Sequence, residues 1–594
     1  MHGNIIRRRG GLVLGRSART LATSTSPATV TTAAPAVPPS RKKLVFDNRK
    51  SFKDFMAASA SGLDKVDPTD LQANRVPYLA RPDGARRKFF LEVYGCQMNS
   101  NDTEILNAIL HNSGYERTLT LADAEIVLLM TCAIRDNAEQ KIWARLAQLR
   151  ALRTKPANGG PSRGLQIGVL GCMAERLRSN LLDDAKLVDV VCGPDAYRSL
   201  PTLLALADDH HQVANVMLSA DETYADIMPL RLDPSNLSAH LSIMRGCNNM
   251  CAFCIVPFTR GTERSRPVHS IVDEVRRLSD QGIREITLLG QNVNSYRDTH
   301  ADSMALATGV GSTLAPGFST IYKRQDGGLR FAELLDRVAA VDPELRIRFT
   351  SPHPKDFPDD LLDVINAHAN IANQIHMPAQ SGSTETLARM RRGYSRDAYL
   401  SLVDRIRTII PGVALSTDII AGFCGETESD HAATVSLMRT VGFDQAFMFA
   451  YSMREKTHAH RRLTDDVSDA DKHRRLAEII DAHYSTAKAK HGRELVGSRV
   501  LVLVEGLSRR QRTRQNAAAA IGAEEDGYDD GAVQQWAGRA ENNLRVHFDL
   551  PANAPVEEEL RGKYAEVVVE SATGASLTGR YVGVSSVREF YATK

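Results

Sequence analysis

Cysteine is scarce in this chain, and long apolar runs are absent from it. Eight of its 594 residues are cysteine, which is far too few to staple a secreted fold of this size with disulfides. No apolar run approaches the roughly 20 residues that a membrane-spanning helix needs, so we expect no insertion into a membrane. Metal ligation becomes the leading use for the cysteines.

Acidic residues are missing from the N-terminal segment. Residues 1–46 contain no Asp or Glu, are rich in Ser, Thr and Ala, and carry a group of arginines, Arg7, Arg8, Arg9, Arg16 and Arg19. This composition is typical of an organellar transit peptide, so we predict a mitochondrial matrix address. A disordered basic tail is the alternative. Residues 47–85 are polar without sustained periodicity, which predicts a linker.

The chain also has little net charge. A value of +3 neither supports nor excludes a nucleic-acid partner, so any basic surface must be local. The length exceeds that of one ordinary hydrophobic core, and we expect two to four domains.

Residues 86–205 alternate strand-like and helix-like patterns, which predicts an α/β layer with a parallel sheet. A cysteine follows each of three expected strands within two residues. The strands are Phe89–Tyr94, Ile126–Met130 and Leu165–Leu170, and the cysteines are Cys96, Cys132 and Cys172. Because parallel strands end at one carboxyl edge, these three cysteines could meet there. Cys192 also follows a strand-like run, and spacing alone does not exclude it.

Residues 237–490 contain six further strand-helix units, which fit a partial TIM-like barrel with its chemistry at the strand ends. The expected strands are Leu241–Met244, Glu285–Leu289, Arg346–Thr350, Gln374–Met377, Ala414–Ile420 and Ala446–Ala450. Cys247, Cys251 and Cys254 follow the first strand as CxxxCxxC. This spacing places three thiolates around an iron-sulfur cube and leaves the fourth iron without a cysteine. Structural zinc, which favours four closed ligands, and a chance cluster of buried thiols are the alternatives.

Residues 491–590 show β-like alternation, which predicts a small all-β barrel, interrupted by a low-complexity insert at 516–531. Arginines form a candidate surface for RNA phosphates in this segment. They are Arg509, Arg510, Arg512, Arg514, Arg539 and Arg545. A solvated basic loop, balanced by the acidic insert, is the alternative.

The cysteine motif at the first barrel strand resembles the radical S-adenosylmethionine superfamily. With Cys96, Cys132 and Cys172 added, residues 86–590 resemble the MiaB-type tRNA methylthiotransferases, whose order is a cluster-binding domain, a radical barrel and a TRAM domain. Segments that carry the resemblance begin at Arg348 (RFTSPHP), Gln380 (QSGS) and Ser416 (STDIIAGF). Tyr451–Thr457 and the insert after Tyr296 are most similar to the eukaryotic mitochondrial branch, the cyclin-dependent kinase regulatory-subunit-associated family.

The resemblance implies two 4Fe-4S clusters and bound S-adenosylmethionine. Cys96, Cys132 and Cys172 would hold an auxiliary cluster, and Cys247, Cys251 and Cys254 the radical cluster; the family pattern leaves Cys192 to packing. Gly290, Gln291 and Asn292 would contact the methionine part of S-adenosylmethionine, and Ser416 and Asp418 its ribose. Such polar residues at strand ends can instead cap helices or satisfy turns. No catalytic residue beyond the cluster ligands is implied.

The implied function is methylthiolation of isopentenyl-adenosine next to the anticodon of mitochondrial tRNA. The implied partners are a tRNA anticodon loop and an electron donor, with room for a protein partner, and we expect a monomer. Enzymatic alternatives act on threonylcarbamoyl-adenosine or on a ribosomal protein side chain. Another alternative is a non-catalytic regulator that binds a kinase, but such a scaffold has no need of six ligand cysteines.

Overall fold

The computed structural model describes most of the chain after residue 85. The described residues are 43–46, 84, 86–133, 136–154, 164–178, 180–183, 188–208, 212–219, 221–305, 314–320, 327–520, 534–550 and 560–592. The predicted linker, except Gly84, and most of the predicted targeting segment lie outside them. Residues 43–46, at the end of that segment, form a strand that joins the first sheet.

The first domain is built on a parallel sheet of seven strands, in the order β1-β7-β6-β5-β4-β2-β3. The strands are β1 (Lys43–Phe46), β2 (Lys88–Val93), β3 (Glu116–Thr118), β4 (Ile126–Thr131), β5 (Gln166–Gly171), β6 (Val190–Cys192) and β7 (Gln212–Asn215). The parallel α/β layer is confirmed. Four of the seven strands have only three or four residues, too few for a clear sequence pattern.

Helices cover both faces of this sheet, which explains why β4 is buried along its whole length. Ile126, Leu128 and Met130 of β4 pack with α3 (Gln97–Asn112) and α7 (Leu200–Asp208). The alternate residues Val127 and Leu129 pack with the opposite layer. That layer contains α4 (Asp136–Thr154), α5 (Cys172–Leu177) and α6 (Asn180–Asp183).

The second domain has the six predicted barrel strands, and the partial barrel is confirmed. Two three-stranded parallel sheets, β14-β11-β8 and β15-β16-β17, are joined by a bridge between Ile347 and Ile371. The strands are β8 (Ser238–Ser242), β11 (Glu285–Leu289), β14 (Arg346–Phe349), β15 (Gln374–His376), β16 (Ala414–Ala421) and β17 (Gln445–Ala450). Helices of the domain include α8 (Val256–Arg260), α9 (Val268–Asp280), α11 (Phe331–Ala339), α12 (Asp359–Ala367), α13 (Thr384–Arg389), α14 (Arg396–Ile409), α15 (Glu428–Val441), α16 (His458–Arg462) and α17 (Asp469–Glu494).

The first barrel strand differs from its prediction, Leu241–Met244. β8 begins and ends earlier because its pairing with β11 covers Ser238 to Ser242. Met244 belongs to a separate short strand, β9 (Met244–Arg245), which pairs antiparallel with β10 (Arg264–Ser265).

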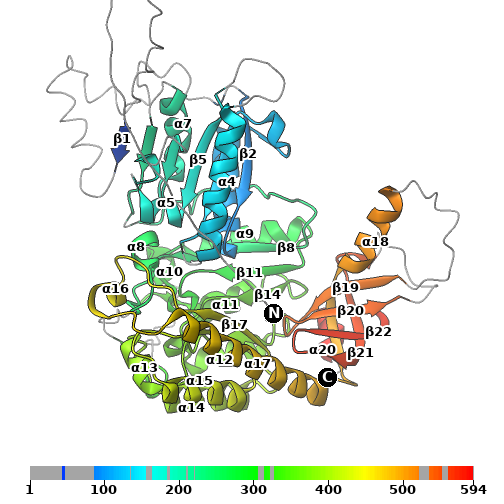
Figure 1. The fold of residues 1–594 in the computed structure, drawn as a ribbon. Helices are drawn as coiled ribbons and strands as arrows, with labels where there is room; N and C mark the ends of the chain where they lie inside the picture. Colours follow the sequence, from blue (N-terminus) through cyan, green and yellow to red (C-terminus); the bar gives the residue numbers. More distant parts are fainter. Residues whose placement is uncertain are drawn as a thin grey trace, which may run out of the picture. The chain divides into compact units, whose positions relative to one another are not determined.

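The C-terminal domain is a small β barrel, as predicted, and it is closed by five strands (Figure 1). Its order is β18-β19-β20-β22-β21, and it closes because β21 pairs with β18; the strands are β18 (Arg499–Leu507), β19 (Gln535–Ala540), β20 (Arg545–Asp549), β21 (Tyr564–Ala572) and β22 (Ser576–Ser585). The basic run from Arg509 is helical and not a loop, in α18 (Arg509–Ala520), and its arginines are exposed. This helix includes residues 516–520 of the predicted insert, and the rest of the insert lies outside the described residues.

Two arginines of β14 attach the small barrel to the larger one. Arg346 donates to the carbonyl oxygen of Leu501 at 3.0 Å, and Arg348 donates to that of Ala540 at 2.8 Å. Arg348 also donates to the Glu285 carboxylate at 2.9 Å, so the buried charge is paired. Within the described ranges, no helix is both long and apolar enough to cross a membrane.

Candidate cluster and substrate site

Three cysteines of the first domain lie at the carboxyl ends of three adjacent strands. Cys96 is the N-cap residue of α3 after β2, Cys132 directly follows β4, and Cys172 begins α5 directly after β5. Because β2, β4 and β5 are neighbours in the sheet, the predicted convergence is observed. Cys192, by contrast, belongs to the hydrophobic core beneath α3 and α7.

Glycine precedes two of these cysteines because the chain turns sharply there. Gly95 has a φ of +120° and Gly171 one of +90°, values that side chains rarely adopt. A Cβ on Gly95 would lie 2.5 Å from the Cβ of Cys132, so the two segments touch. A glycine with a positive φ also precedes the radical motif, since Gly246 has a φ of +76°.

The radical motif forms a tight loop between β9 and α8. The Cys247 N–H donates to the carbonyl of Gly261 at 3.1 Å, and the Cys254 N–H donates to that of Cys251 at 3.0 Å. Arg392, fully inside the fold, donates from Nη1 to the Cys251 sulfur at 3.3 Å. The loop is therefore held by backbone bonds and by one buried guanidinium.

The two sets of cysteines approach one another through α8 and the residue before it. Ile255, the residue after Cys254, packs against Cys172 and Ala133. Arg260, at the end of α8, donates from Nε to the Cys172 sulfur at 3.2 Å. The segment that follows the radical motif thus contacts the auxiliary cysteines directly.

Burial and neighbouring charges affect the thiols differently. A hydrogen bond with Cys132 lowers the pKa of the Cys96 thiol to about 6, assisted by the charge of Arg260 and opposed by burial. Burial raises the pKa of Cys172, and it raises the pKa of Cys254 to about 12. Buried thiolates need a compensating cation, which iron supplies when it binds.

The donor sets fit iron-sulfur clusters better than zinc. In the described ranges, no three His, Cys, Asp or Glu groups stand close enough to share one metal ion. A structural zinc favours four protein ligands around one ion, whereas each set here offers three cysteines, as a cluster with one open iron does. Arg260 Nη1 and Asn249 Nδ2 are buried without a hydrogen-bond acceptor beside the two sets. A cluster's sulfur atoms would supply acceptors for such donors.

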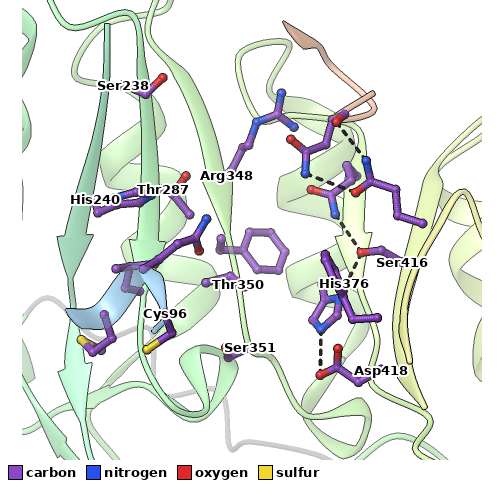
Figure 2. Close-up of a pocket in the computed structure, with 18 of the residues that line it drawn as sticks. Cys96, Ser238, His240, Thr287, Arg348, Thr350, Ser351, His376, Ser416 and Asp418 are labelled. Carbon is purple, nitrogen blue, oxygen red and sulfur yellow. Dashed lines mark hydrogen bonds and ion pairs between the residues drawn. The ribbon is translucent and has the colours of Figure 1, made fainter. Parts of the chain in front are cut away.

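A cavity of about 1070 Å³ connects the auxiliary cysteines with the barrel interior and the small β barrel. Cys96, Cys132 and Cys172 line it, as does Arg260. Figure 2 shows Cys96 on one side and His376, Ser416 and Asp418 on the other, with Thr350 and Ser351 between them. The radical motif's cysteines are not part of the lining, although α8 of the same segment is.

The predicted Gly290, Gln291 and Asn292 lie next to the radical motif. The Gly246 N–H donates to Gln291 Oε1 at 2.6 Å, which ties this segment to the cysteine loop. Asn292 donates to Glu263 at 3.2 Å, and its own Oδ1 is buried without a donor. Gly290 and Gln291 line the cavity, whereas Asn292 does not.

The predicted Ser416 and Asp418 lie on β16 and both contact one histidine. His376 Nδ1 lies 3.0 Å from Ser416 Oγ, and His376 Nε2 lies 3.4 Å from Asp418 Oδ2. Gln374 donates to the same Ser416 oxygen at 3.0 Å. Phe447, with 47% of its surface exposed, packs its ring edge-on to His376 in the cavity wall.

The cavity includes only part of the predicted RNA-binding set. Arg512 and Arg539 line it, together with Arg561, which the sequence did not single out. The other four arginines, Arg509, Arg510, Arg514 and Arg545, are not in the lining. Arg545 instead pairs with Glu505 at 3.0 Å.

Comparison with known proteins agrees with this arrangement. The Radical SAM superfamily matches residues 241–438, and the "Uncharacterized protein family UPF0004" matches residues 88–193. The "Mitochondrial tRNA methylthiotransferase CDK5RAP1" of Mus musculus is 50% identical over 552 residues, 91% of this chain and 88% of the relative. The Homo sapiens protein of the same name is 49% identical over 562 residues, 91% of this chain and 89% of the relative.

A bacterial relative matches as well. The "tRNA-2-methylthio-N(6)-dimethylallyladenosine synthase" of Chloroherpeton thalassium is 46% identical over 494 residues, 83% of this chain and 96% of the relative. This chain belongs to the tRNA methylthiotransferase family. The first domain, radical barrel and small β barrel described above are therefore those of a methylthiotransferase.

Sequence reasoning missed several residues of this methylthiotransferase site. Arg260, Arg392 and His376 contact cysteines or cavity residues that lie 40 to 141 positions away in the chain. A short-range motif cannot reveal such pairs. The one signal available was the glycine before Cys96, Cys172 and Cys247, which marks a turn at the end of a strand.

Proposed function

We propose that the chain converts isopentenyl-adenosine beside the anticodon of mitochondrial tRNA to its 2-methylthio derivative. The observation that carries this proposal is the meeting of two three-cysteine sets, because Ile255 and Arg260, which follow the radical motif, contact Cys172. Cys96, Cys132 and Cys172 would hold the auxiliary cluster, and Cys247, Cys251 and Cys254 the radical cluster. The mouse relative is named a mitochondrial tRNA methylthiotransferase, and the bacterial relative a tRNA-2-methylthio-N(6)-dimethylallyladenosine synthase.

The chemistry requires cofactors because the hydrogen on carbon 2 of adenine is neither acidic nor a leaving group. When bound, two 4Fe-4S clusters and S-adenosylmethionine supply the sulfur, the methyl group and the radical that removes this hydrogen. Side chains of the protein then have to position these groups and the base.

The chain's own residues supply this positioning. Gly95, Gly171 and Gly246 turn the backbone directly before Cys96, Cys172 and Cys247. Gln291 holds the loop of the radical motif through Gly246. We assign Gly290, Gln291 and Asn292 to the methionine part of S-adenosylmethionine. Asn292 Oδ1, buried without a donor, is suited to accept from its amino group.

Ser416 is a weaker candidate for a ribose contact than Asp418. Ser416 Oγ already accepts from Gln374 and is hydrogen-bonded to His376 Nδ1. Asp418 keeps about a third of its side chain exposed to the cavity. We therefore keep Asp418 as the ribose contact and assign Ser416 to holding His376 in place.

The cavity is suited to a base from a single-stranded loop. Its volume of about 1070 Å³ slightly exceeds the roughly 300–1,000 Å³ of ordinary ligand pockets. Bases of anticodon loops can be splayed out and stacked on aromatic rings, and Phe447 offers a half-exposed ring in the wall. Arg512 and Arg539 at the side of the small β barrel would hold RNA phosphates. The other four predicted arginines would extend that surface.

The proposal also covers the cellular location of the protein, its electron donor and its oligomeric state. The relatives' names place this branch in the mitochondrion, which agrees with the acid-free segment 1–46. An electron donor must reduce the radical cluster. A monomeric state stays a prediction, as does a protein partner.

Nucleoside mass spectrometry of organellar tRNA from a deletion strain tests the substrate. We expect 2-methylthio-isopentenyl-adenosine to disappear and its unthiolated precursor to accumulate. Its retention would contradict the proposal, and loss of methylthio-threonylcarbamoyl-adenosine instead would favour the alternative substrate. If the unmodified gene restores 2-methylthio-isopentenyl-adenosine in the deletion strain and a Cys251→Ala variant does not, a purely non-catalytic role is excluded.

A further inference from the structure

A buried carboxylate joins the segments that carry the two cysteine sets. Asp102 lies on α3, whose N-cap is Cys96, and its side chain is fully buried. Its two oxygens each pair with an arginine at 2.8 Å: Oδ1 with Arg245 and Oδ2 with Arg260. Arg245 lies two residues before Cys247, and Arg260 lies six residues after Cys254.

Arg260 is aimed at the auxiliary cysteines rather than at those of its own segment. Its Nε donates to Cys172 at 3.2 Å, and its Nη2 donates to Asn99 Oδ1 at 3.2 Å, one turn of α3 after Cys96. The side chain is buried, and its Nη1 has no hydrogen-bond acceptor. A buried guanidinium that leaves one donor unpaired is costly unless something else accepts from it.

We propose that Arg260, supplied by the radical domain, is a positioning residue for the auxiliary cluster and raises that cluster's reduction potential. This inference rests on the proposed function, because it needs a cluster on Cys96, Cys132 and Cys172. Asp102 fixes the guanidinium, Nε binds the Cys172 sulfur, and the free Nη1 supplies a further donor to the cluster's sulfur atoms. The electronic state of the auxiliary cluster is thereby set from the other domain.

The direction of the effect follows from charge. Reduction adds an electron to a group that already carries three thiolates. A nearby positive charge and N–H donors to sulfur stabilise the reduced form and raise the potential. Asp102 neutralises this charge only in part, because Arg245 shares the same carboxylate.

The experiment measures the auxiliary cluster alone, in full-length protein that carries Cys247→Ala, Cys251→Ala and Cys254→Ala. In this background the iron content should be about four per chain. Redox titration followed by electron paramagnetic resonance then gives the potential of one cluster. Arg260→Gln should shift that potential downward, and Arg260→Lys, which keeps the charge but not the fork of donors, should shift it less.

Arg392→Gln in the same background controls for the loss of a buried guanidinium, because Arg392 is also buried but lies beside position 251 instead of the auxiliary cysteines. It should leave the auxiliary potential unchanged. If an Arg260 variant that retains its cluster shows an unchanged reduction potential, the inference is overturned. The inference is also overturned if Arg392→Gln shifts the potential of the auxiliary cluster by as much as the Arg260 substitution does. Absence of iron from the triple-alanine background itself would instead contradict the proposed function.

Discussion

Single residues differ in this protein mainly by what surrounds them, and the cysteines show this most directly. Cys192 packs among Phe89, Leu200 and other apolar side chains of the first domain. Cys424 packs with Phe423 and Tyr451 in a separate apolar cluster. The remaining six stand at strand ends or in the radical loop, and a buried arginine contacts one cysteine of each set: Arg260 contacts Cys172, and Arg392 contacts Cys251. Membership of an apolar cluster, away from the buried arginines, therefore separates these two thiols from the ligand candidates.

Buried histidine His483 should make the stability of the barrel domain depend on pH. Burial lowers the pKa of His483 to about 4; His491 adds to this and Asp444 opposes it. The unfolded chain, with a histidine pKa near 6.5, binds the proton more readily. Stability is therefore fully present above about pH 6.5 and falls as the pH drops to about 4, by at most about 3 kcal/mol.

Urea unfolding at pH 7 and pH 4.5 measures this effect. His483→Gln, which removes the titrating group, should lose less stability over this interval than the unmodified protein does. Equal losses in the two proteins would contradict the assignment.

At the scale of elements, the turns before the cysteines should be intolerant of side chains. A Cβ at Gly246 would lie 1.9 Å from the carbonyl oxygen of Thr262, and one at Gly95 would lie 2.5 Å from the Cβ of Cys132. Gly246→Ala should therefore lower iron content by about four atoms per chain through loss of the radical cluster, and Gly95→Ala should do so through the auxiliary cluster.

Gly282→Ala separates this effect from backbone strain alone. Gly282 has a φ of +82°, but a Cβ there would meet no atom within 4 Å. We expect this variant to lose some stability and to keep both clusters in the iron assay. Full iron content in the Gly246→Ala and Gly95→Ala variants would show that these turns do not control cluster binding.

Most strands could be predicted because their apolar runs are unambiguous, and Glu285–Leu289 agrees to the residue. Helix α18 could not, because Arg509–Ala520 has no apolar periodicity to indicate a packed face. It forms because Arg, Gln and Ala favour the helix intrinsically. Short strands such as β3 and β6 exist only through their neighbours in the sheet, which local patterns do not record.

For the whole molecule, the cavity shared by three domains predicts how RNA binding responds to charge. Arg512 is exposed and lines the cavity from α18. Arg512→Ala should weaken binding of the tRNA by roughly fivefold, or about 1 kcal/mol, and lower the salt dependence of binding by about one ion. Filter binding across a salt series measures both quantities.

Arg493→Ala is the control for a general loss of positive charge. Arg493 is exposed on α17, pairs with Glu494 and does not line the cavity. Its substitution should leave affinity and salt slope close to those of the unmodified protein. An equal loss in both variants would argue against a phosphate contact at Arg512.

From the sequence alone, only those residues of the candidate site that lie close together in the chain could be predicted. The radical cysteines lie within eight residues, so their motif indicates their chemistry by itself. Cys96, Cys132 and Cys172 needed the topology of a parallel sheet and a family resemblance. Arg260 and Asp102, which are 158 positions apart, meet only when two domains pack, and no sequence pattern records that contact.

The central claim is that two separate sets of three cysteines each hold one cluster. Iron and sulfide content of anaerobically purified protein tests it most directly, with Cys132→Ala, Cys251→Ala and, as a packing control, Cys192→Ala. We predict about eight irons for the unmodified chain and for the Cys192→Ala variant, and about four for each of the other two. Four or fewer irons in the unmodified chain, or loss of both clusters from either single substitution, would contradict the account.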